Sequence, residues 1–124
     1  MTSELDAEQT KPQTKRVACM SWIPALATTR SLMLTEAGYE VISLCGKTDL
    51  ERLGEYVNCL DLLILAHSVP VAEKRRALVL FKQGNRTPVL SLLNFHQTKL
   101  PEADFGVEAF SPSEFVKVVK EILE

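Results

Sequence analysis

Short apolar runs of strand length alternate with segments of helical pattern through most of this chain, and this alternation limits the possible folds. The predicted strands cover residues 16–20, 39–45, 61–66, 87–93 and 107–110. Runs this short and apolar are compatible with strands that are buried on both faces. Strands that alternate with helices predict an α/β fold with a parallel sheet covered on both sides.

The predicted helices fill the gaps between these strands, except between the last two. Their ranges are 24–37, 48–56, 73–83 and 112–124. Pro24 suits the first position of a helix, and Gly38 suits the residue just after a helix end. The segment 94–106 has no helical period, so we expect a loop, and loops of this length are usually functional or mobile.

Side-chain spacing predicts which face of each helix is buried. In the first helix, Leu26, Met33 and Ala37 form the expected inward stripe, with Arg30 and Glu36 outside it. In the last helix the expected inward residues are Phe115, Val118, Val119 and Ile122, and the expected outward ones are Lys117, Lys120, Glu121 and Glu124.

Two helix starts carry capping patterns. Thr48 and Glu51 have the spacing of a capping box. Ser111, Pro112 and Glu114 supply an N-cap, a proline at the first helical position and a capping acid, in that order.

Composition limits the classes of function. The 124 residues predict one domain, from residue 15 to residue 124, after a polar tail at 1–14 that is expected to be disordered. The net charge of -2 argues against nonspecific binding to nucleic acid or to anionic membranes. The chain has neither a secretory signal nor an apolar run of transmembrane length, so we expect a cytoplasmic protein. The three cysteines show no metal-binding spacing and are expected to be reduced.

The third predicted strand ends in the most informative stretch, LDLLILAHSVP at residues 60–70. In open parallel sheets, ligands and chemistry collect at the carboxyl ends of the strands. Function is therefore expected in the turns after Met20, Leu65 and Leu93. The residue at the tip of the third strand, however, is Ala66, which carries no reactive group.

Four stretches, taken in order, resemble the receiver domain of bacterial two-component response regulators. They read RVACMSWIPALATTRSLMLTEAGYEV, DLLILAHSVP, TPVLSLL and SPSEFVKVVKEIL, and the resemblance covers residues 16–124. It implies a flavodoxin-like, CheY-like three-layer sandwich with a five-stranded parallel sheet in the order 2-1-3-4-5. The helix between strands four and five is replaced here by the loop at 94–106.

The resemblance also implies phosphoryl transfer to an aspartate, with Mg²⁺ held by an acid pair. In this chain the phosphoacceptor position is Ala66, and the acid-pair positions are Ser21 and Trp22. Leu93 stands at the position of the switch hydroxyl, and Ser111 aligns with the lysine through a shortened spacing. No catalytic residue, metal or cofactor is therefore expected, and the chain is predicted to be a pseudo-receiver without enzymatic activity.

The sequence leaves more than one function open. The first is a stand-alone signalling module that binds a protein partner, as a monomer or weak dimer, without nucleic acid or membrane. The alternative is a small-ligand or anion-binding module, and a third is an unconventional enzyme that uses His67. The candidate interaction edge comprises Ser21, Trp22, His67, Ser68 and Asn94.

Each of these residues also has a structural interpretation. Trp22 could fill the vacant cation site, or it could pack over the sheet edge. His67 could be a loop histidine that hydrogen-bonds backbone, and Ser68 could cap the turn before the third helix. A metal site that pairs His67 with His96 is conceivable, and the basic cluster at 73–77 is expected to be a solvated helix face.

Overall fold

A computed structural model describes residues 14–56, 58–83, 86–94, 97–108 and 111–124. The predicted tail at 1–14 lies outside the described residues except for Thr14, so the proposed domain boundary stays a prediction. None of the helices in the described ranges combines the length and the apolar character needed to span a membrane.

Five parallel strands form one sheet in the order β2-β1-β3-β4-β5. Their bounds are β1 Arg16–Ser21, β2 Glu40–Cys45, β3 Leu62–Leu65, β4 Val89–Leu92 and β5 Phe105–Val107. In the central pairs, Val17 lies opposite Leu62 and Leu63 lies opposite Val89. The predicted fold class and strand order are confirmed.

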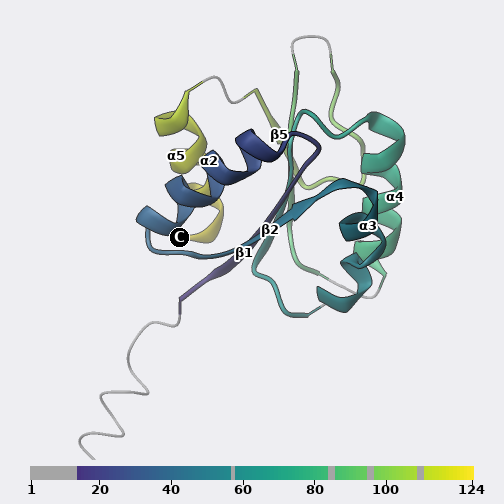
Figure 1. Cartoon of the computed structure of the whole chain (residues 1–124), viewed down its shortest axis with the longest axis horizontal. Coiled ribbons are helices and arrows are strands. Elements are labelled where there is room, and N and C mark those ends of the chain that lie inside the picture. Colours follow the sequence, from purple (N-terminus) through teal and green to yellow (C-terminus); the bar gives the residue numbers. More distant parts are fainter. Residues whose placement is uncertain (1–13, 57, 84–85, 95–96, 109–110) are drawn as a thin grey trace, which may run out of the picture.

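Helices cover both faces of the sheet, as Figure 1 shows, with α2 and α5 on one side and α3 and α4 on the other. The bounds are α2 Pro24–Glu36, α3 Gly46–Glu51, the short 3₁₀ helix η1 Leu53–Tyr56, α4 Val71–Lys82 and α5 Pro112–Leu123. The described part of the predicted loop before β5, residues 94 and 97–104, contains no helix.

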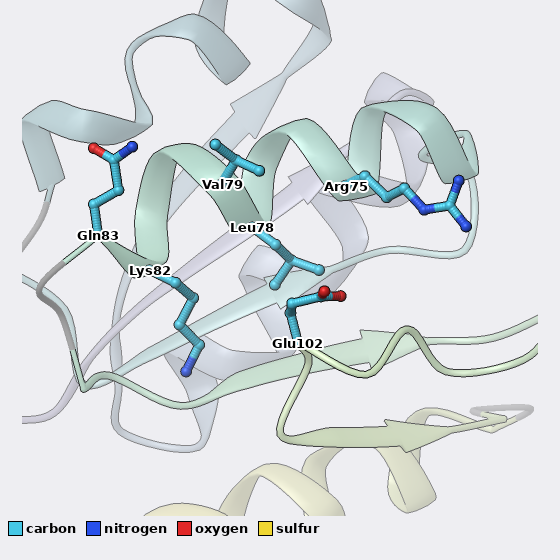
Figure 2. Close-up of a pocket in the computed structure, with 6 residues that line it drawn as sticks. All are labelled: Arg75, Leu78, Val79, Lys82, Gln83 and Glu102. Carbon is cyan, nitrogen blue, oxygen red and sulfur yellow. The ribbon is translucent and has the colours of Figure 1, made fainter.

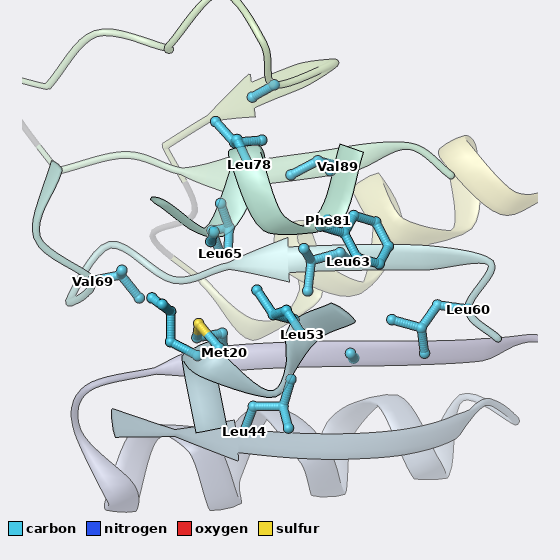
Figure 3. Packing of buried hydrophobic residues seen from close by; sticks show 14 of the residues in the cluster. Met20, Leu44, Leu53, Leu60, Leu63, Leu65, Val69, Leu78, Phe81 and Val89 are labelled. Carbon is cyan, nitrogen blue, oxygen red and sulfur yellow. The ribbon is translucent and has the colours of Figure 1, made fainter. Parts of the chain in front are cut away.

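Side chains alternate across the central strands and so supply two apolar cores. Ala18 and Met20 of β1 point into the core beneath α3 and α4, whereas Val17 and Cys19 point into the core beneath α2 and α5. Figure 3 shows the first core, in which Met20, Leu63 and Phe81 are completely buried. Strands buried on both faces hold the turns at their carboxyl ends in place.

Several predicted boundaries differ from the structure: α4 begins at Val71 and not at 73, and β4 spans Val89–Leu92 and not 87–93. The second helix begins at Gly46 and not at the predicted capping box of Thr48 and Glu51. The Asp49 carboxylate accepts a hydrogen bond from the Cys45 N–H at 2.7 Å, and Gly46 adopts a φ of +83°, so the chain turns directly from β2 into α3. The last strand begins at Phe105, earlier than the predicted 107, and residues 109–110 lie outside the described residues.

The predicted inner face of the first helix is only partly right: Met33 and Ala37 pack against the core and Glu36 is exposed, as expected, but Arg30 is not outside the stripe. The buried residues of α2 are Ala27, Arg30 and Leu34, and Arg30 was expected to lie outside the stripe. The helix packs against both the sheet and α5, so its contact stripe is displaced by about one position. In α5 the prediction is confirmed, with Phe115 and Val119 fully inward.

Candidate functional site

The tip of the third strand is closed by backbone hydrogen bonds. Ala66 follows β3 and is completely buried. Its N–H donates to the Met20 carbonyl at 2.8 Å, and its own carbonyl accepts the Val69 N–H at 3.1 Å. The first bond joins the ends of the two central strands, and the second makes the chain turn toward α4. The residue at the tip of this strand therefore carries only a methyl group.

Two serine hydroxyls bond to each other at the neighbouring strand ends. Ser21, the last residue of β1, is completely buried, and its Oγ lies 3.0 Å from the Ser68 Oγ. The Ser68 Oγ also accepts the Trp22 N–H at 2.9 Å, and the Ser21 Oγ accepts the Ile23 N–H at 3.1 Å. Ser68 lies in the turn before α4, as predicted, but its hydroxyl bonds to Ser21 and to the Trp22 N–H and not within that turn. This hydroxyl cluster ties the β1 end to the turn after β3.

Trp22 is partly buried and packs against the core beneath α3 and α4. The interpretation that it packs at the sheet edge is confirmed. Its side chain covers apolar surface, while its backbone N–H belongs to the hydroxyl cluster.

His67 lies in the turn after β3, and its ring contacts α2. Its Nδ1 lies 3.3 Å from Nη2 of Arg30 in α2. The predicted bond from His67 to backbone is therefore replaced by a side-chain contact. Burial lowers the pKa of His67, and the positive charges of Arg30 and Lys74 lower it further. The neutral ring can accept a hydrogen bond from Arg30 through Nδ1.

A buried lysine at this edge is one of the residues that the sequence interpretation missed. Lys74 of α4 is only 2% exposed, so it is not part of a solvated helix face. Its Nζ donates to the Ser91 Oγ at 2.9 Å and to the Leu92 carbonyl at 2.8 Å. Gln97 Oε1 lies farther away, at 3.5 Å. Burial lowers the pKa of Lys74 from 10.5 to about 8.

Helical spacing could have identified this lysine. Lys74 precedes Leu78 by four residues and Phe81 by seven, and both of these are buried. Lysines are mostly exposed, so Lys74 was assigned to the surface although its helical spacing matches that of the buried residues.

The remaining predicted site residues do not join the hydroxyl cluster. Leu93 is partly buried, and its N–H donates to the Val107 carbonyl at 2.8 Å. Asn94 is exposed, and its N–H donates to Gln97 Oε1 at 3.0 Å. Ser111 caps α5 by accepting the Glu114 N–H at 3.2 Å, as its capping pattern predicted.

Metal-ligand clusters are absent from the described ranges. They contain no group of three or more His, Cys, Asp or Glu side chains that could hold an ion. His96 lies outside the described residues, so the conceivable pairing with His67 stays a prediction.

A separate cavity of about 440 Å³ lies along α4 (Figure 2). It is lined by Arg75, Leu78, Val79, Lys82, Gln83 and Glu102. None of the strand-tip residues lines it, so it is a feature of the helix surface and not of the candidate site.

Comparisons by sequence alone find no relatives. No protein-family model matches the chain, and no curated protein sequence matches it significantly.

Comparison of structures gives many matches. A response regulator receiver domain from Bacillus halodurans superposes with a TM-score of 0.71 at 18% identity, over 89% of this chain and 97% of that one. The chemotaxis response regulator CheY4 of Vibrio cholerae gives 0.70 at 20% identity, over 90% and 100%. A signal receiver domain from Bermanella marisrubri gives 0.70 at 18%, over 90% and 100%. The chain therefore has the CheY-like, flavodoxin-type fold that its structural neighbours, response regulator receiver domains, share.

Proposed function

We propose that the chain is a receiver-like signalling module of a two-component or phosphorelay system, that it is not phosphorylated at its third strand, and that it acts by binding a protein partner. The observation that carries this proposal is the hydroxyl cluster of Ser21 and Ser68 beside the buried methyl group of Ala66. Without a nucleophile or carboxylate ligands at the strand tips, the module is not an enzyme.

Phosphoryl transfer to a receiver needs a carboxylate nucleophile and oxygen ligands for a cation. Ser21, Trp22 and Ala66 supply none of these groups. The Ser21 and Ser68 hydroxyls bond to each other and to the N–H groups of the following turn. The Lys74 ammonium is likewise occupied by acceptors of its own chain. The edge thus has few polar groups left to offer a phosphoryl group.

The same bonds weigh against the alternative, a ligand site built from Ser21, His67, Ser68 and Asn94. The serines bond to each other, His67 contacts Arg30, and Asn94 is exposed beyond the end of β4. A protein partner can bind the surface of the domain even when these polar groups already have hydrogen-bond partners within the chain. We expect a cytoplasmic monomer or weak dimer that binds neither nucleic acid nor membrane.

The test of non-phosphorylation is a two-dimensional amide NMR titration with Mg²⁺, followed by Mg²⁺ with beryllofluoride, which mimics a phosphoryl group on aspartate. The expected result is that the resonances of Ser21, Trp22, Ala66, His67 and Leu93 do not move. Concerted shifts of these resonances at sub-millimolar Mg²⁺ would overturn the proposal.

A variant with Ser21→Asp, Trp22→Asp and Ala66→Asp is the positive control, because it restores carboxylates at the three mapped positions. Mg²⁺ shifts in this variant, together with none in the natural chain, would show that the substitutions explain the difference. Should the variant not fold, the titration of the natural chain still decides the question.

The protein-binding part is tested by affinity capture with matched variants. A specific partner should be retained by the natural chain and by Leu32→Ala, which alters an exposed apolar residue of α2. It should be lost with Trp22→Ala, which alters the predicted edge. Equal retention by all three chains would contradict the role of this edge.

A further inference from the structure

Arg30 carries a buried positive charge that forms no ion pair with any described residue. Its side chain lies on the inner face of α2 and the residue is only 8% exposed. The ion pairs between described residues involve other cations, namely Arg16, Arg52, Arg76 and Lys82. Burial of a charge is costly unless a partner compensates it, and none of the described carboxylates pairs with this guanidinium.

The described neighbours of the guanidinium are uncharged, and they contact only some of its nitrogen atoms. Nη2 contacts the His67 ring at 3.3 Å, and the carbon at the centre of the group lies 5.9 Å from the centre of the Phe115 ring. The Nη1 atom has no hydrogen-bond partner, although it is buried. Buried donors are nearly always paired in native proteins, so Nη1 lacks an acceptor.

A cavity of about 180 Å³ adjoins this arginine, between α2 and the start of α5. Its walls are mainly apolar, and among the described residues that line it Arg30 alone is charged. It is lined by Leu26, Thr29, Arg30, Met33, Ser111, Pro112 and Phe115. The N-terminus of the twelve-residue helix α5 adds a partial positive charge beside it.

The helix N-terminus alone would make a poor anion site here. Pro112 has no N–H, and the Glu114 N–H is already bonded to the Ser111 hydroxyl. Direct recognition therefore depends on Arg30, and α5 contributes only its dipole. Nη1 has almost no exposed surface, so the guanidinium must turn toward the cavity when a ligand enters.

We propose that this cavity binds the carboxylate of a small monocarboxylic acid, with Nη1 of Arg30 as its ionic partner and the apolar walls around its hydrocarbon part. One guanidinium among apolar side chains matches a single negative charge, whereas a phosphate dianion needs more donors than this cavity has. The volume lies below that of ordinary ligand pockets, which suits an acid of few carbon atoms. The site is distinct from the strand-tip cluster and goes beyond the proposed signalling role.

The test is an amide NMR titration of the full chain at pH 7.5 with isovalerate, with its neutral amide isovaleramide, and with inorganic phosphate. Isovalerate should give saturable shifts at Leu26, Arg30, Ser111 and Phe115. Isovaleramide should bind at least about tenfold more weakly, because it lacks the charge that strengthens a hydrogen bond to arginine. An equal response to acid and amide, or no response to either, would overturn the proposal.

Two variants locate the site. Arg30→Met should abolish the isovalerate shifts, while Arg75→Met, which removes an exposed arginine from α4, should leave them unchanged. Unchanged binding by Arg30→Met would refute the assignment. Stronger shifts with phosphate than with isovalerate would refute the ligand class. If Arg30→Met does not fold, the comparison of acid with amide in the natural chain decides the matter.

Discussion

The Lys74 ammonium donates a hydrogen bond of 2.9 Å to the Ser91 hydroxyl inside the molecule, and this contact fixes α4 to the carboxyl end of β4. A buried ammonium loses its hydration, and the Leu92 carbonyl offsets part of that cost by accepting a second bond at 2.8 Å. The strand-tip region therefore holds an internal cation whose acceptors come from the protein itself.

This buried lysine should make stability depend on pH in the alkaline range. The pKa of Lys74 is about 8 in the folded chain and near 10.5 in the unfolded one. Between these values the unfolded chain binds the extra proton, so the free energy of unfolding should rise as pH increases from 8 to 10.5. The full gain is up to about 3 kcal/mol, at 1.36 kcal/mol for each pKa unit.

The measurement is urea unfolding of the natural chain and of Lys74→Met at several pH values between 7 and 10.5. Other groups also titrate in this pH range. Their contribution is removed when the unfolding free energy of Lys74→Met is subtracted from that of the natural chain at each pH. The difference in unfolding free energy between the two proteins should change by a few kcal/mol in favour of the natural chain. Parallel pH profiles would show that Lys74 keeps an ordinary pKa.

Ser68→Ala should destabilise the fold by roughly 1–2 kcal/mol, because it leaves the Trp22 N–H without its acceptor and removes the partner of the Ser21 hydroxyl. Urea unfolding at pH 7 measures the loss. Ser113→Ala, at an exposed position in the first turn of α5, is the matched control and should change stability less. An equal effect of both substitutions would mean that the hydroxyl cluster contributes little.

The sequence predicted the strands and most helices because short apolar runs and prolines are local signals, whereas the strand order came from the resemblance to receiver domains. It also predicted that no nucleophile stands at the β3 tip, since the identity of Ala66 is enough for that. Arg30 and Lys74 were misplaced because charge was taken as a sign of exposure. Their burial depends on tertiary neighbours, the Phe115 ring for one and the end of β4 for the other.

The hydroxyl cluster could not be predicted from the sequence for a related reason. Ser21 and Ser68 are far apart in the sequence, and only the parallel register that places Met20 opposite Leu65 brings the two strand ends together. The resemblance to receivers located both positions at one edge. It could not show that the two hydroxyls would bond to each other.

Gly106→Ala should destabilise the last strand. A Cβ atom at this position of β5 would lie 2.8 Å from the Cβ of Lys99, which is too close for two carbon atoms. The loop must shift to admit the methyl group, and overpacking of this kind costs about 1–3 kcal/mol. Gly54→Ala is the control, since no atom lies within 4 Å of its added Cβ. Urea unfolding that ranks the two variants equally would contradict the tight packing of the loop against β5.

His67 should titrate below the ordinary histidine value of 6.5. Burial disfavours its charged form, and so do the cations Arg30 and Lys74. As pH falls through 6.5 the unfolded chain binds the proton first, so this group lowers stability on the acid side and has no effect above that pH.

The ring-proton NMR signal gives the pKa of His67, and the variant His67→Gln assigns that signal. Arg30→Met should raise the pKa toward 6.5, because it removes a positive charge 3.3 Å away, whereas Arg75→Met should not. A midpoint at or above 6.5 in the natural chain, or one that Arg30→Met leaves unchanged, would show that the guanidinium does not contact the ring in solution.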